Sequence, residues 1–123
     1  MSKLKILIVD DSPTMRRILV NTVIKSGYSD VKEAEDGKDA LAKLMAGEFD
    51  LVMTDWNMPN MSGLELVQAV RADEKLKKIP ILMVTTRNMK EDIVNAIKSG
   101  VNGYTVKPFD AKTLYAKISE VIN

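Results

Sequence analysis

The sequence predicts an α/β fold in which a parallel sheet of five strands is doubly wound by five helices. Five short apolar runs rich in β-branched residues recur along the 123 residues, and each is followed by a stretch with apolar side chains at helical spacing. Parallel strands need such crossover connections, whereas a tight turn joins only antiparallel neighbours. The length is that of one domain, large enough to bury a core without covalent help.

The five strands are predicted from apolar runs that end in polar or turn residues. They are expected at residues 4–9, 30–34, 51–54, 79–84 and 103–106, of which 30–34 has the weakest pattern. The central runs are nearly continuous in apolar residues, as is required of strands that are covered on both faces.

The predicted helices have clear start signals and apolar faces. The first begins at Ser12-Pro13, Ser62 and Glu65 form a capping box for the third, and Asp110 is the N-cap of the fifth. The apolar faces contain Met15, Ile18, Leu19 and Val23 in the first helix, Ala40, Leu41, Leu44 and Met45 in the second, Ile93, Ala96 and Ile97 in the fourth, and Leu114, Ile118, Val121 and Ile122 in the fifth.

Composition excludes several classes of protein. The chain has no Cys and no His, which removes disulfides, Ser-His triads and zinc sites built on these residues. A net charge of +1 gives no case for nucleic-acid binding by bulk electrostatics. Residues 4–9 are too short for a signal peptide, and no apolar run spans a membrane, so we expect a cytoplasmic location.

Polar side chains follow four of the five predicted strands. In an open parallel sheet, ligands bind at the carboxyl ends of the strands, so these side chains are expected at one edge. Taken singly, each has an ordinary explanation, such as a turn acid or a solvated lysine; their joint placement indicates a site. The set comprises Asp10 and Asp11 after the first strand, Asp55 and Asn57 after the third, Thr85 after the fourth and Lys107 after the fifth.

Three carboxylates at one edge repel one another, and one would take up a proton unless a cation intervened. An oxygen-only set of ligands points to Mg²⁺. Because Asp10 and Asp11 come from one strand end and Asp55 from another, two carboxylates can hold the metal while Asp55 attacks phosphorus and becomes an aspartyl phosphate. Lys107 and Thr85 can then contact phosphoryl oxygens.

These residues resemble the receiver domain of two-component response regulators, over the whole chain. Residues 9–12, 14–17, 33–37 and 55–61 are similar in detail to receivers of the chemotaxis type. The resemblance implies a flavodoxin-like strand order of 2-1-3-4-5. It also implies that residues 1–123 form a single receiver domain without an output domain.

The resemblance implies a role for each acidic residue. A sensor histidine kinase donates a phosphoryl group to Asp55, and the receiver itself catalyses this Mg²⁺-dependent phosphorylation and its reversal, without being a metabolic enzyme. Mg²⁺ is held by Asp11 and Asp55, by Asp10 largely through water, and by Asn57 through its backbone carbonyl.

The resemblance also implies one cis peptide bond and a response to phosphorylation at two further positions. The Lys107-Pro108 bond is expected to be cis. Thr85 moves toward the phosphoryl group and Tyr104 turns inward. Thr86 and Arg87 depart from the common pattern beside the pocket, and we expect them to alter the lifetime of the phosphorylated state.

The implied output is binding by a monomer to the flagellar motor switch, with a sensor histidine kinase and a phosphatase as further partners and neither nucleic acid nor membrane involved. The expected docking surface is the fourth helix, fifth strand and fifth helix, with Lys90, Tyr104, Lys112 and Lys117.

A phosphorelay intermediate or kinase regulator outside motility is an open alternative function. A flavodoxin-like electron carrier is disfavoured, because Asp10 and Asp11 would repel a flavin phosphate. A phosphatase of the haloacid-dehalogenase type is disfavoured by Asn57, where a second acid is needed.

Overall fold

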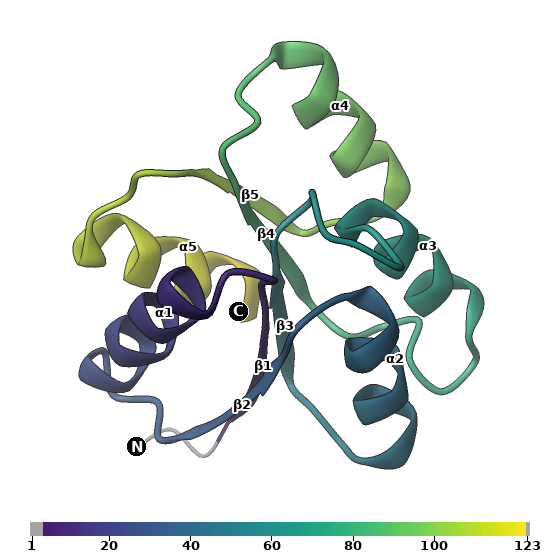
Figure 1. The fold of residues 1–123 in the computed structure, drawn as a ribbon, viewed down its shortest axis with the longest axis horizontal. Coiled ribbons are helices and arrows are strands. Elements are labelled where there is room, and N and C mark those ends of the chain that lie inside the picture. Colours follow the sequence, from purple (N-terminus) through teal and green to yellow (C-terminus); the bar gives the residue numbers. More distant parts are fainter. Residues whose placement is uncertain (1–3, 123) are drawn as a thin grey trace.

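The computed structural model describes residues 4–122, in which five strands alternate with five helices (Figure 1). The strands are β1 (Lys5–Val9), β2 (Asp30–Ala34), β3 (Leu51–Thr54), β4 (Ile81–Thr85) and β5 (Gly103–Val106). The helices are α1 (Pro13–Lys25), α2 (Gly37–Ala46), α3 (Gly63–Ala72), α4 (Lys90–Ser99) and α5 (Ala111–Ile122). None of these helices has the length and apolar character needed to cross a bilayer.

The sheet is parallel and has the strand order β2-β1-β3-β4-β5, which confirms the predicted fold class and topology. Its register positions the polar residues that follow the strands. Val9 of β1 lies opposite Thr54 of β3, so Asp10 and Asp55 leave the sheet at the same level. On the other side, Thr85 of β4 lies opposite Val106 of β5, directly before Lys107.

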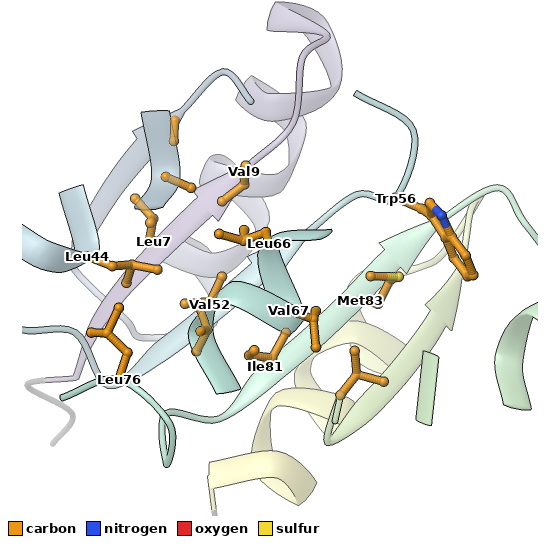
Figure 2. Packing of buried hydrophobic residues seen from close by; sticks show 14 of the residues in the cluster. Leu7, Val9, Leu44, Val52, Trp56, Leu66, Val67, Leu76, Ile81 and Met83 are labelled. Carbon is orange, nitrogen blue, oxygen red and sulfur yellow. The ribbon is translucent and has the colours of Figure 1, made fainter. Parts of the chain in front are cut away.

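Helices cover both faces of the sheet, with α1 and α5 on one face and α2, α3 and α4 on the other (Figure 1). Alternate strand residues supply the two cores. In β1, Leu7 and Val9 pack in the cluster under α2 and α3, whereas Ile6 and Ile8 pack in the cluster under α1 and α5. Figure 2 shows the first cluster, where Leu66 of α3 packs near strand residues. All four β1 residues are completely buried, as expected for a central parallel strand.

Three predicted helix starts have the expected hydrogen bonds. The Ser62 hydroxyl accepts from Glu65 N at 3.1 Å, while Ser62 N donates to Glu65 Oε1 at 2.9 Å, which completes the capping box of α3. Ser12 accepts from the backbone N–H of Met15 at 3.2 Å. Asp110 accepts from that of Thr113 at 2.7 Å.

Two predicted boundaries of strands need correction. β1 begins at Lys5 rather than Leu4, and β4 spans Ile81–Thr85 rather than residues 79–84. Pro80 has no N–H for the ladder, although its carbonyl accepts from Val52 N at 3.0 Å. Thr85 is therefore the last residue of β4 and not the first residue after it.

Three residues assigned to apolar helix faces are about half exposed. They are Ile18 of α1, Met45 of α2 and Ile97 of α4. The buried face of each of these helices is narrower than its apolar periodicity predicts, with Leu19 and Val23 buried in α1, Gly37, Ala40 and Leu44 in α2, and Ala96 in α4.

Candidate functional site

Three carboxylates converge where β1 and β3 end. One oxygen from each of Asp10, Asp11 and Asp55 lies within 4.8 Å of the other two. Asp10 is buried, Asp55 is partly buried and Asp11 is exposed. The structure thus brings together the three acids that the sequence placed at two strand ends.

Asp10 is held in place on three sides. Its Oδ1 accepts from Ser12 N at 2.9 Å, and its Oδ2 accepts from Lys107 Nζ at 2.8 Å. Its carbonyl oxygen accepts from the Arg16 guanidinium at 2.6 Å, and Arg16 also forms an ion pair with Glu33 at 2.8 Å. Both carboxylate oxygens of Asp10 are therefore already engaged. Sequence reasoning assigned no role to Arg16, because nothing in its spacing shows that it reaches back to a carbonyl.

Lys107 lies between two of the acids. Its Nζ is 2.8 Å from Asp10 Oδ2 and 3.1 Å from Asp55 Oδ2, and its side chain is only 7% exposed. Burial acts to lower the pKa of this ammonium, but the hydrogen bond to Asp10 and the charges of Asp55 and Asp10 outweigh burial and raise the pKa above its usual value. Lys107 is thus a charged, paired cation at neutral pH. The Lys107-Pro108 bond is cis, as expected.

The backbone around Asp55 is tightly packed. Asp55 Oδ1 accepts from Trp56 N at 2.6 Å, and Asp55 Oδ2 accepts from Lys107. Gly63 at the start of α3 presses against the Asp55 carbonyl so closely that a Cβ at Gly63 would collide with it. The carboxylate is therefore held at a defined position, close to a cation and open to solvent on one side.

Thr85 and Tyr104 lie beside this pocket on β4 and β5. Thr85 is fully buried, and its hydroxyl accepts from Arg87 N at 3.3 Å. The Tyr104 hydroxyl donates to the Arg87 carbonyl at 2.9 Å, while its ring packs against the core. Burial, reinforced by the charge of Asp92, raises the pKa of Tyr104, which keeps this hydroxyl a donor. The expected movements of Thr85 and Tyr104 stay predictions.

Arg87 spans the pocket above Trp56. Its guanidinium donates to Asn57 Oδ1 at 2.9 and 3.1 Å, forms an ion pair with Asp92 at 3.3 Å, and stacks 4.4 Å from the centre of the Trp56 ring. Asn57 itself is exposed. The sequence marked Arg87 only as an unusual residue. Its contacts with Asn57 and Trp56 join residues that are 30 and 31 positions away, and they have no local signature in the sequence.

The donor set fits a hard divalent cation. The three carboxylates supply only oxygen, and Asp11 makes no hydrogen bond or ion pair with another residue in the described range 4–122. A free carboxylate beside two partly compensated ones is an arrangement that Mg²⁺ stabilises.

The fold and this acidic site, with its lysine, define a receiver domain. The family model described as the response regulator receiver domain matches residues 6–119, so the chain belongs to this family and is a response regulator of two-component signalling.

Within the family, the chain is similar to chemotaxis regulators. It is 52% identical to chemotaxis protein CheY of Pseudomonas aeruginosa, over 96% of this chain and 95% of the relative. It is 51% identical to chemotaxis protein CheY-3 of Vibrio cholerae, over 96% and 91%. The chain is thus a homologue of CheY proteins.

Solved structures show the same fold. Chemotaxis protein CheY4 of Vibrio cholerae matches with a TM-score of 0.90 and 40% identity, over 98% of this chain and 99% of the other. The receiver domain of a sensor histidine kinase from Pseudomonas aeruginosa matches with a TM-score of 0.89 and 26% identity, over 98% of both chains, and that structure has a magnesium ion coordinated in its active-site cleft.

Proposed function

We propose that this response regulator accepts a phosphoryl group on Asp55 in a Mg²⁺-dependent reaction. The observation that supports this most directly is the position of the Asp55 carboxylate, which contacts Lys107 at 3.1 Å and converges with Asp10 and Asp11. A carboxylate oxygen needs no general base to attack an activated donor, so Asp55 can act as a nucleophile.

The transfer from a phosphohistidine donor is a simple exchange of bonds. An Asp55 oxygen forms the new bond to phosphorus as the P–N bond of the donor breaks, and the bonding electron pair leaves with the imidazole nitrogen. Lys107 is positioned to pair with an oxygen of the group transferred to Asp55, and the Thr85 hydroxyl contacts another after it moves inward.

The metal site in this proposal uses Asp11 and Asp55 directly, Asp10 largely through water and Asn57 through its carbonyl. The engagement of both Asp10 oxygens supports the indirect role of that residue. Bound Mg²⁺ would supply positive charge to neutralise the carboxylates and the phosphoryl oxygens.

We further propose that the chain acts as a stand-alone cytoplasmic monomer with a CheA-like sensor histidine kinase as donor and a FliM-like flagellar motor switch protein as target. Similarity to CheY over 95% of the length of that relative supports this assignment. The docking surface consists of α4, β5 and α5, on which Lys90 and Lys112 are exposed while Tyr104 and Lys117 are partly exposed. A phosphatase partner belongs to the same proposal.

The phosphoacceptor is tested with Asp55→Asn. Trp56 is the only tryptophan and adjoins Asp55, so its fluorescence should respond to Mg²⁺ and then to beryllofluoride, and intact mass should show one phosphoryl group after treatment with a small phosphodonor. Asp55→Asn should abolish the mass increase. Asp30→Asn, which changes an exposed acid at the opposite end of the sheet, should behave like the parent. Phosphorylation of Asp55→Asn to the parental level would overturn the assignment.

The target is tested by comparing two classes of partner. Motor-switch fragments should gain affinity for the chain only after activation with beryllofluoride. If a histidine phosphotransfer domain exchanges phosphoryl groups with the chain and motor-switch fragments do not bind, the phosphorelay alternative replaces the motor assignment.

A further inference from the structure

Arg87 connects two sides of the phosphorylation pocket. On one side, it bonds to Asn57 and stacks on Trp56, the two residues that follow Asp55 most closely. On the other side, it forms an ion pair with Asp92 in the first turn of α4. Its guanidinium is therefore shared between the loop that carries Asp55 and the start of a helix.

The contact with Asp92 is the weaker part of this arrangement. Only one guanidinium nitrogen takes part, at 3.3 Å, and the two side chains are 37% and 23% exposed. Partly exposed ion pairs of this kind contribute little, whereas arginine binds phosphoryl oxygens with paired, parallel hydrogen bonds. A phosphoryl group on Asp55 would replace a charge of −1 with about −1.5 to −2 and offer three strong acceptors.

The two ends of α4 are held very differently. At the C-terminal end, Gly100 is in the left-handed conformation, and its carbonyl accepts from Arg71 at 2.7 and 3.0 Å. At the N-terminal end, the cap residue Met89 makes no side-chain capping bond and is exposed. At this less anchored end, the Arg87–Asp92 pair is a side-chain contact that links the first turn of α4 to the segment after β4.

We propose that Arg87 binds the phosphoryl group on Asp55 and gives up Asp92 in exchange, so that phosphorylation loosens the first turn of α4. Asn57 guides the exchange because its Oδ1 already holds two guanidinium nitrogens on the pocket side. This proposal rests on the proposed phosphorylation of Asp55 and adds a phosphoryl-binding residue to it.

Opposite effects of two substitutions test the exchange. Beryllofluoride is titrated against the Mg²⁺-loaded chain, with Trp56 fluorescence as the readout. Arg87→Gln removes a ligand and should raise the half-saturating concentration, whereas Asp92→Asn removes the competitor and should lower it. Each change should be about two- to fivefold, the range of a partly exposed ion pair. Glu91→Gln removes the same charge from the same turn of α4 and should leave the midpoint within error of the parent.

Hydrogen exchange of the amides at residues 88–94 provides the second readout. In the parent, beryllofluoride should accelerate exchange there. Asp92→Asn and Arg87→Gln should show the faster exchange without beryllofluoride, and Glu91→Gln should match the parent.

The outcomes separate the two proposals. If the parent fails to respond to beryllofluoride and takes up no phosphoryl group, the proposed function itself is wrong. If the parent responds but Asp92→Asn raises the midpoint or matches Glu91→Gln, the partner exchange is wrong and the phosphoacceptor assignment stands. Unchanged exchange at residues 88–94 in the activated parent would refute the loosening of α4.

Discussion

Lys107 is the residue whose charge the pocket depends on, because it pairs with both Asp10 and Asp55 while almost fully buried. A buried ammonium without those partners would be costly, and so would the two acids without the ammonium. The raised pKa of Lys107 is the measurable sign of this mutual stabilisation.

This coupling predicts how stability changes at alkaline pH. A raised folded-state pKa means that the contribution of Lys107 is fully present below its ordinary pKa of 10.5 and is lost as pH rises through the folded value. The difference in unfolding free energy between the parent and Lys107→Met should therefore narrow above about pH 10.5. Denaturant titrations from pH 7 to 12 check this, and a constant difference across that range would contradict it.

A second prediction at the residue scale concerns Thr105 of β5. Its hydroxyl is buried, and Oγ1 has no hydrogen-bond partner within residues 4–122. Replacing an unsatisfied buried hydroxyl with a methyl group should be stabilising, so Thr105→Val should raise the free energy of unfolding by about 1 kcal/mol. Thr54→Val is the matched control, because the buried Thr54 hydroxyl donates to the Asp55 carbonyl at 2.9 Å, and this change should destabilise. Destabilisation by Thr105→Val, measured by urea unfolding, would count against the prediction.

At the same scale, the sequence could predict which acids and which lysine meet, since strand ends of a parallel sheet share one edge. It could not predict the hydrogen bond from Arg16 to the Asp10 carbonyl, or the contacts of Arg87 with Asn57 and Trp56. Those depend on how long flexible side chains are oriented in three dimensions.

At the scale of elements, the start of α3 couples helix capping to the site. The capping box formed by Ser62 and Glu65 encloses Gly63, the first residue of α3, which presses on the Asp55 carbonyl. Ser62→Ala should lower the free energy of unfolding by about 1 kcal/mol, because it leaves an N–H of the first turn unsatisfied. Glu65→Gln keeps an acceptor for Ser62 N and should cost less. Thermal unfolding of both variants shows which one loses more unfolding free energy, and equal losses in the two variants would contradict the prediction.

All ten elements were predicted from the sequence, most of them because their apolar periods agree with the final packing, and α1, α3 and α5 also because their caps form the expected hydrogen bonds. The pattern was weakest for β2, which is mostly exposed, and α4 has no side-chain cap. The first residue of β4 could not be predicted, because Ile79 and Pro80 continue the apolar run although proline has no N–H to donate to the hydrogen-bond ladder of the sheet. The exposure of Ile18, Met45 and Ile97 was likewise out of reach, since the width of each buried stripe is set by how the helix lies on the sheet.

At the scale of the whole molecule, the convergence of three carboxylates predicts stabilisation by Mg²⁺. A ligand that binds only the folded state at about 100 times its dissociation constant adds about 2.7 kcal/mol. Thermal unfolding at pH 7 should shift upward with MgCl₂ relative to NaCl of equal ionic strength. Asp11→Asn should remove most of the shift, while Asp30→Asn should retain it. An equal Mg²⁺ shift in Asp11→Asn and the parent would contradict this site.

Asp10 and Lys107 are 97 positions apart in the chain, and this separation matters during synthesis. During synthesis, β1 and β3 leave the ribosome well before β5, so the acids are translated before the ammonium that compensates two of them. A nascent chain that stops short of β5 carries mutually repelling carboxylates at its sheet edge. This edge of the sheet therefore reaches its final electrostatic balance only after β5 has been translated and packed beside β4.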